Sequence, residues 1–349
     1  MTVTDRDPPG GPLSGLLVVD LTRVLAGPFA TMMMADLGAR VVKVERPGRG
    51  DDARAYGPYV GGRSLYFGRV NRGKESVALD LRTEPDREVL LALVERADVL
   101  VENFRPGVMD RLGLGWEALS ARNPRLVYAS VSGFGQTGPW RERPAYDTVV
   151  QAAAGMLTIT GEPGGPPIKP GTSIADLSAG LYAFGAVLAA LRGRDLTGRG
   201  ARVDVALFDA TLSLLEGAGL HYLARGTEPP RIGNAHHSIS PFGTFACADA
   251  PIVVCAAHDG LFGVLSTVLG RPELVTDGRF VDNEARSRTP TRRPAVGSAR
   301  TAAPTRVRAG PSRRAGSSRS ARRPGRPARA APRGPARPAG PAPPTPSPG

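Results

Sequence analysis

The feature that most constrains this 349-residue chain is an alternation of short apolar runs with segments of helical periodicity. The apolar runs predict strands at residues 16–20, 40–45, 76–81, 98–102 and 126–132. Helices are predicted between them, at 27–37, from Thr83 and from Pro106. Strands that alternate with helices are typical of a parallel sheet covered on both faces. The sequence therefore predicts an α/β fold, a Rossmann-like doubly wound parallel sheet.

Composition divides the chain into four predicted parts. Residues 1–12 are polar and rich in Pro and Gly, which favours a flexible N-terminus. Residues 13–215 hold the large Rossmann-like domain. Residues 216–290 hold a linker helix and an incomplete small α+β domain, with a strand at 252–255 and a helix at 261–269. Residues 291–349 contain no Leu, Ile, Phe, Tyr or Trp, so they cannot bury enough apolar surface to offset their ordering entropy, and they predict a disordered tail.

The tail also explains the charge of the chain. Its 14 Arg account for the net charge of +13, because the rest of the chain holds 31 basic and 32 acidic residues. A body with a net charge of −1 does not indicate a nucleic-acid partner. The tail has two interpretations, which stay open: a genuine basic segment, or a shifted reading frame near residue 290, which would leave an inactive truncated fragment.

Location is predicted from what the N-terminus and the helices contain. Residues 1–11 lack the pattern of a signal peptide. The most apolar helix, 177–191, is about four residues too short to span a membrane. Two Cys in a chain of this size do not indicate a disulfide framework. We therefore expect a cytoplasmic protein with no membrane partner.

Asp176 is the strongest candidate for chemistry. It lies at the start of an amphipathic helix, three residues after Ser173, which has the place of an N-cap residue. Unpaired backbone N–H groups and the helix dipole favour a carboxylate there, so we expect Asp176 to be ionised near neutral pH and able to act as a nucleophile. The alternative interpretation is that Asp176 only caps its helix.

Several further motifs accompany Asp176 in a fixed order. They are Leu25-Ala26-Gly27-Pro28, Lys43-Val44-Glu45-Arg46-Pro47, Asn71-Arg72-Gly73-Lys74, Glu102-Asn103-Phe104-Arg105-Pro106-Gly107, Asp110-Arg111-Leu112-Gly113, Tyr146-Asp147 and Thr197-Gly198-Arg199-Gly200. Together they resemble the class III CoA-transferases, the family of formyl-CoA transferase and carnitine CoA-transferase, with alpha-methylacyl-CoA racemase as a cousin. The resemblance runs from about residue 13 to about residue 288.

The resemblance implies an enzyme that moves coenzyme A from an acyl-CoA to a small carboxylic acid. Asp176 would carry an aspartyl-CoA thioester intermediate, coenzyme A would be a co-substrate, and no metal would be needed. Members form homodimers whose interlocking requires an intact C-terminus, so a homodimer is expected if the C-terminus is intact.

The resemblance also implies the residues that contact coenzyme A. They are Ala26, Arg46, Leu79, Arg82, Asn103, Phe104, Arg105, Arg111, Tyr146 and Asp147, with Lys74 as a weaker candidate. Arginines suit this ligand because their guanidinium groups bind phosphate oxygens through two parallel hydrogen bonds.

Three alternatives are weighed against this interpretation. An acyl-CoA racemase or isomerase of the same fold would have His at position 146, and Tyr146 is a poor proton shuttle because its phenol titrates near pH 10. The run Gly133-Phe134-Gly135-Gln136-Thr137-Gly138 matches a dinucleotide fingerprint, but Pro139 argues against the helix that should follow it. The four His show no spacing typical of metal ligands.

In the loop 234–240, two His replace a glycine-rich run of formyl-CoA transferase, which argues against specificity for formate or oxalate.

Overall fold

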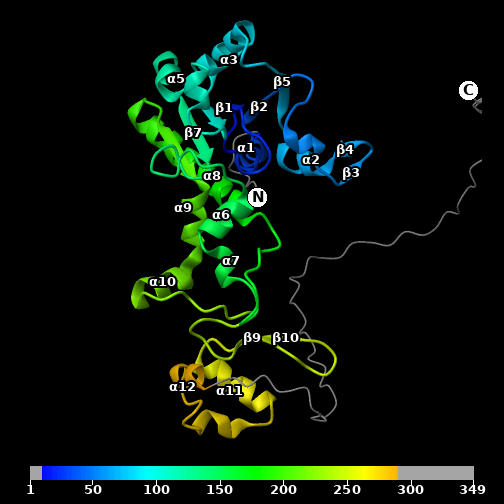
Figure 1. Cartoon of the computed structure of the whole chain (residues 1–349), viewed down its shortest axis with the longest axis vertical. Coiled ribbons are helices and arrows are strands. Elements are labelled where there is room, and N and C mark those ends of the chain that lie inside the picture. The colour runs from blue at the N-terminus through cyan, green and yellow to red at the C-terminus, as the bar shows by residue number, and fades with distance from the viewer. Residues whose placement is uncertain (1–9, 290–349) are drawn as a thin grey trace, which may run out of the picture. The chain divides into compact units, whose positions relative to one another are not determined.

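A computed structural model describes residues 10–289 of the chain. Its centre is a six-stranded parallel sheet in the order β5-β2-β1-β6-β7-β8 (Figure 1). The strands are β1 (Leu17–Asp20), β2 (Arg40–Glu45), β5 (Glu75–Ala78), β6 (Val99–Glu102), β7 (Val127–Ser132) and β8 (Arg202–Ala206). The chain starts in the middle of the sheet, builds one side and then returns to build the other. The predicted doubly wound parallel sheet is confirmed.

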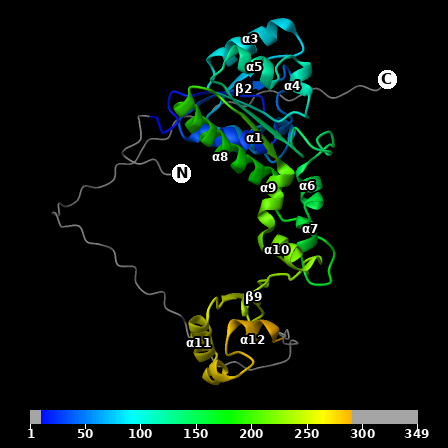
Figure 2. The same ribbon diagram turned by 90° about the vertical axis from the view of Figure 1, so that its left-hand side faces the viewer.

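Helices cover both faces of this sheet. They are α1 (Ala26–Asp36), α2 (Leu65–Asn71), α3 (Glu84–Arg96), α4 (Val108–Arg111), α5 (Trp116–Arg122), α6 (Asp147–Ala153), α7 (Met156–Ile159), α8 (Ile174–Thr197) and α9 (Leu207–Leu212). One apolar core joins Val18 of β1 to α1 and α8, and the other joins its neighbour Val19 to α3 and α5. Consecutive strand residues point to opposite faces, so each strand contributes to both cores. Figure 2 shows α1 and α8 side by side on one face, with α3 and α5 on the other.

The remaining elements connect and extend this sheet. They are η1 (Asp52–Ala55), the hairpin of β3 (Tyr59–Val60) and β4 (Arg63–Ser64), η2 (Ser213–Leu215) and α10 (Glu216–Arg225), then the antiparallel pair β9 (Phe242–Phe245) and β10 (Ile252–Cys255), with α11 (Asp259–Val268), η3 (Pro272–Thr276) and α12 (Asn283–Arg288). The predicted strand at 252–255 is confirmed, and the predicted helix at 261–269 is α11. The domain boundary at residue 215 stays a prediction. The predicted tail and residues 1–9 lie outside the described residues.

Strand β5 and helix α4 have bounds that differ from the predictions, and one strand of the sheet was not predicted. Strand β5 ends at Ala78 instead of residue 81, because the chain turns away from the sheet edge there. Helix α4 begins at Val108, two residues after Pro106, since Gly107 adopts a positive φ of 77° just before it. Strand β8 was not predicted. It is an edge strand whose first three residues are exposed or half-buried and whose last two are buried, so it lacks the continuous apolar run of the central strands.

Helix α8 is longer than predicted. Its 24 residues and its apolar composition are enough to cross a membrane by length and hydropathy alone. In this fold, however, α8 packs on α1, α9, β7 and β8, and it buries a stripe of small residues that includes Ala175, Ala179 and Ala183. It is the central helix of one sheet face. Its buried face explains part of its apolar character, whereas Leu181, Tyr182 and Leu196 are exposed.

Candidate active site

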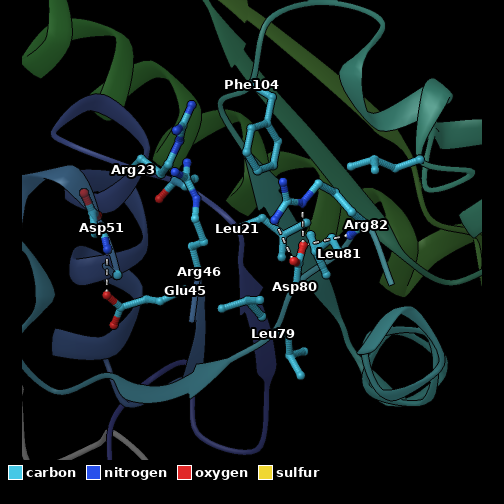
Figure 3. A pocket seen from close by; sticks show the side chains of 14 residues that line it. Leu21, Arg23, Glu45, Arg46, Asp51, Leu79, Asp80, Leu81, Arg82 and Phe104 are labelled. Atoms are coloured by element: carbon cyan, nitrogen blue, oxygen red, sulfur yellow. Dashed lines mark hydrogen bonds and ion pairs between the residues drawn. The ribbon is translucent and has the colours of Figure 1, made fainter. Parts of the chain in front are cut away.

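A pocket of about 160 Å³ opens at the edge of the sheet where β1, β2, β5 and β6 end (Figure 3). It is lined by residues 21–23, 44–46 and 79–82, by Gly50, Asp51, Phe104 and Leu112. The chain reverses direction across the sheet between β1 and β6, and ligands of doubly wound sheets bind at this edge, at such a switch point. The fold therefore places the pocket where a ligand is expected.

Three arginines reach this pocket from three different strand ends. Arg23 follows β1, Arg46 follows β2, and Arg82 lies beyond β5. Arg82 pairs with Asp80 at 2.7 Å in an exposed position. The hydrogen bond from Arg82 lowers the pKa of Asp80 to about 2, and the charge of Arg46 also lowers it. Three guanidinium groups around one pocket suit a ligand with several phosphate oxygens.

Arg23 is a site residue that the sequence did not reveal. Its guanidinium lies 5.2 Å from the centre of the Phe104 ring, and Nη1 lies 3.6 Å from Asp52 Oδ2. Its Nε is buried and has no hydrogen-bond partner within residues 10–289. Figure 3 shows Arg23 and Arg46 on one side of the Phe104 ring, and Arg82 with Asp80 on the other. One sequence signal could have revealed Arg23, because it follows a predicted strand as Arg46 does.

Apolar side chains form the rest of the pocket wall. They are Leu21, Val44, Leu79, Leu81, Phe104 and Leu112. A pocket that combines leucines and an aromatic ring with convergent arginines can hold a flat heterocycle beside phosphates. Coenzyme A has this chemistry, so the residues present fit it.

Asn103 joins two of the chain segments that surround the pocket. Its Oδ1 accepts a hydrogen bond from the Arg23 backbone N–H at 2.8 Å, and its Nδ2 donates to the Arg23 carbonyl at 2.8 Å. The amide of Asn103 is therefore occupied in joining the end of β6 to the loop after β1. In this structure Asn103 positions Arg23.

Asp176 lies in the first turn of α8, beside a second carboxylate. Asp147 Oδ1 accepts hydrogen bonds from the backbone N–H groups of Ala175 at 3.0 Å and Asp176 at 3.3 Å. Ser173 has the predicted N-cap position, but its side chain makes no capping hydrogen bond. The cap of α8 thus comes from Asp147, which is buried and held in turn by Gln151 Nε2 at 2.6 Å.

The pKa of Asp176 is higher than its position at a helix N-terminus predicted. Burial raises the pKa of Asp176 to about 7, and the neighbouring Asp147 carboxylate contributes to the rise. The helix N-terminus was expected to dominate, but Asp147 already occupies its first N–H groups with a negative charge. The ionised form of Asp176 therefore increases as the pH rises through the neutral range.

Tyr66 of α2 is a second residue that sequence reasoning missed. Burial raises the pKa of its phenol, and the next largest cause is the negative charge of Asp176. Tyr66 therefore lies within electrostatic reach of Asp176, although 110 residues separate them in the chain. No motif marks it, because only the packing of α2 brings it to this place. A phenol there can donate a hydrogen bond to an oxygen that becomes negative during acyl transfer.

Helices α1 and α8 connect the pocket to Asp176. A Cβ at Gly180 would lie 2.7 Å from the Ala26 carbonyl oxygen, so only glycine allows this close approach. Gly180 lies one turn beyond Asp176 on the same face of α8. Ala26 is the first residue of α1 and follows Arg23 by three positions. The β1–α1 connection therefore runs from the pocket to the surroundings of Asp176.

Comparison with known proteins agrees with this geometry. The profile of CoA-transferase family III matches residues 13–306. The chain belongs to this family.

Individual relatives support the assignment. The chain is 55% identical over 287 residues to an acetyl-CoA:oxalate CoA-transferase from Acetobacter aceti, covering 82% of this chain and 74% of the relative. It is 42% identical over 291 residues to a succinate–glutarate CoA-transferase from Agrobacterium fabrum, covering 81% and 73%. A crystal structure of a CAIB/BAIF family protein from Brucella suis has a TM-score of 0.70 at 46% identity, covering 80% of this chain and 75% of that one.

The other residues predicted for coenzyme A fall into three groups. Arg46, Leu79, Arg82 and Phe104 line the pocket, whereas Ala26 and Asp147 lie near Asp176. Arg105, Arg111 and Tyr146 are exposed and do not line the pocket, so their roles stay predictions.

Lys74, the weaker candidate, is occupied elsewhere. Its Nζ pairs with Asp20 at 2.9 Å, and both side chains are buried. Lys74 is therefore part of the core.

The two remaining motifs have the following places. Gly133–Gly138 follows β7, but the next element, α6, begins only at Asp147. The helix N-terminus that a dinucleotide fingerprint requires is thus not there. Within residues 10–289, no three His, Cys, Asp or Glu side chains gather as metal ligands would. His236 and His237 stack at 4.3 Å in the loop after α10.

Proposed function

We propose that this protein transfers coenzyme A from an acyl-CoA to a small carboxylic acid through an aspartyl-CoA thioester on Asp176. The observation that carries the proposal is the position of Asp176. A carboxylate with a pKa of about 7 stands at the start of α8, and the β1–α1 connection joins it to a pocket with three arginines. Such a carboxylate is ionised often enough to attack near neutral pH, and burial makes it more reactive than a solvated one.

The chemistry needs no group beyond the substrates. The Asp176 carboxylate attacks the thioester carbonyl, so that a mixed anhydride forms and CoA thiolate leaves. The thiolate attacks the aspartyl carbonyl, which gives the aspartyl-CoA thioester and releases the first acid. The acceptor carboxylate then attacks this thioester, and the returning thiolate takes the acyl group from the new anhydride. Asp176 ends as a free carboxylate.

For the acceptor we propose a small dicarboxylic acid. The two relatives compared above are named for oxalate and for glutarate. The loop with the stacked His236 and His237 presents two imidazoles where a glycine-rich loop was expected. We expect these bulky side chains to change which dicarboxylate fits. A screen of oxalate, succinate and glutarate against acetyl-CoA and succinyl-CoA identifies the pair.

Trapping of the intermediate tests the reaction. The 349-residue chain is incubated with an acyl-CoA and hydroxylamine, digested, and analysed by mass spectrometry. We expect a hydroxamate on Asp176 and none on Asp147. An unmodified Asp176 in a chain that turns over acyl-CoA would contradict the proposal. Exchange of the proton alpha to the thioester in D₂O, without transfer to any acid, would indicate a racemase instead.

Replacing Asp147 with Asn is expected to shift the pH profile of transfer toward acid. The Asp147 carboxylate raises the pKa of Asp176, so a neutral Asn lowers that pKa and allows Asp176 to ionise at lower pH. The capping bonds can survive, because an Asn oxygen still accepts from the two N–H groups. Gln151 can rotate its amide to accept from the new NH₂ group, since its Oε1 has no partner within residues 10–289. The measurement is kcat against pH, and an unmoved acid limb would contradict the coupling.

We also propose that the active protein is a homodimer. Several large apolar side chains are exposed on neighbouring helices, namely Leu181, Tyr182, Leu212, Leu220 and Leu223. An exposed apolar patch on α8, α9 and α10 favours association. Light scattering during gel filtration is expected to give twice the chain mass, and Leu181→Glu combined with Leu223→Glu is expected to give a monomer. A monomeric parent chain would contradict this proposal.

A further inference from the structure

The loop that joins β1 to α1, residues 21–25, contains a strained residue. Val24 has a φ of +68°, in the left-handed region that β-branched residues rarely occupy. Such strain persists only where the surroundings hold it, and it clusters at functional sites. Here the strained residue directly follows Arg23, which lines the pocket, and α1 begins two positions later.

Asp51 holds the backbone at this point. The Val24 N–H donates to its carboxylate, at 3.1 Å from Oδ1 and 3.4 Å from Oδ2. Lys43 Nζ lies 2.9 Å from Asp51 Oδ2, and both side chains are 1% exposed. Lys43 also donates to the Thr22 carbonyl oxygen at 2.7 Å. One buried ion pair therefore holds the loop at two positions, before and after Arg23.

A second buried ion pair holds the start of the same loop. The Thr22 backbone N–H donates to Asp20 Oδ1 at 2.8 Å, and Asp20 pairs with Lys74. Although burial opposes ionisation, the charges of Lys74 and Lys43 hold the pKa of Asp20 well below its usual range. With Asn103 bonded to both backbone groups of Arg23, the backbone N–H groups of residues 22 to 24 all have side-chain partners.

Such an arrangement is poorly explained by stability alone. A buried ion pair is often no more stabilising than two apolar side chains of similar volume. Leucine and methionine could replace the ion pair without loss only if the backbone groups that Asp51 and Lys43 bind found other partners. What an apolar pair could not do is hold the N–H of Val24 and the carbonyl of Thr22.

We propose that Asp51 is a positioning residue for coenzyme A binding, which with Lys43 keeps Val24 in its left-handed conformation and so holds Arg23 in the pocket. The same contacts of Asp51 and Lys43 place the first turn of α1 beside α8 and Asp176. Arg23 and Asp51 both line the pocket, and the role proposed for Asp51 is to hold the loop that carries Arg23. The inference rests on the proposed function, because it takes the pocket as the coenzyme A site.

The test replaces the ion pair by an apolar pair, Lys43→Met with Asp51→Leu, in the full chain. Coenzyme A affinity is measured by titration calorimetry, and amide exchange of the peptide covering residues 21–25 by mass spectrometry. We expect Kd to rise on the order of tenfold, as for the loss of one charge-assisted contact. Exchange in the peptide becomes faster, and the melting temperature falls, because the Val24 N–H, the Thr22 carbonyl and the Ala53 N–H lose buried partners.

Val24→Gly separates positioning from a general structural role. Glycine adopts a positive φ without strain, so a loop with glycine at this position depends less on being held. The apolar pair introduced into the Val24→Gly chain is expected to raise Kd by less than about threefold relative to Val24→Gly alone. An equal rise in both backgrounds would overturn the proposal, and so would an unchanged Kd.

The proposal can still be tested if the apolar variant does not fold, or if the parent chain does not bind coenzyme A. If the double variant does not fold, the coenzyme A Kd of Asp51→Asn is measured in the parent and in the Val24→Gly chain. Asn keeps the volume of Asp51, but its NH₂ group faces the donors Val24 N–H, Ala53 N–H and Lys43 Nζ. Arg46→Ala serves as the reference for the pocket. A parent chain that does not bind coenzyme A contradicts the proposed function. In that case exchange of the 21–25 peptide still decides whether Asp51 holds the loop, and unaltered exchange overturns the proposal.

Discussion

Replacing Asp176 with Asn is expected to abolish coenzyme A transfer while coenzyme A still binds. The amide has the shape of the carboxylate but cannot form the anhydride, so the loss should be on the order of 10⁴-fold or more, as for other catalytic nucleophiles. Initial rates of acyl-CoA formation measure the loss, and calorimetry checks that the Kd for coenzyme A is kept. The control is Asp147→Asn, which removes a carboxylate next to Asp176 but leaves the nucleophile. Substantial turnover by the Asp176→Asn variant would exclude Asp176 as the attacking group.

The same substitution has a second consequence, for stability. The pKa of Asp176 is raised from 3.8 to about 7 in the folded protein. A raised pKa contributes stability that is complete below the unfolded value and is lost as the pH rises through the folded value. Above pH 7 the folded chain therefore carries a poorly solvated charge that Asn lacks. Since Asp176 is partly exposed, we expect a gain of about 1–2 kcal/mol for Asp176→Asn at pH 8, and a smaller gain at pH 5. Melting curves at the two pH values measure it.

Replacing Arg46 with Ala is expected to raise the KM for acyl-CoA by about ten- to a hundredfold, because one charge-assisted contact to phosphate is worth about 1.5–3 kcal/mol. The chemical step at Asp176 should change less. Arg49→Ala is the matched control, since Arg49 is exposed and pairs with Asp52 but does not line the pocket. Arg46→Lys should fall between the two, as lysine keeps the charge and loses the paired hydrogen bonds. An equal effect of Arg46→Ala and Arg49→Ala would show only that net charge steers the ligand.

The sequence by itself determined five of the six strands of the sheet and the place of Asp176 in the first turn of a helix. Strand β2 has the predicted bounds because a strand buried on both faces is rich in apolar residues, and Val41, Val42 and Val44 supply them around the buried Lys43. Asp176 lies in the first turn of α8, which begins at Ile174, because helical periodicity starts in this part of the chain. Arg46 lies in the pocket because residues that follow parallel strands meet at one edge. Each of these predictions depends only on neighbours along the chain.

Only the tertiary structure decided how these residues act. The cap of α8 comes from Asp147, 29 residues away, and the same carboxylate helps to raise the pKa of Asp176. Asn103 bonds to both backbone groups of Arg23, 80 residues away in the chain. A pKa depends on desolvation and on charges nearby in space, and a hydrogen-bond partner depends on which segments pack together. Neither quantity is local in sequence, so the fold had to bring these groups together before their roles could be assigned.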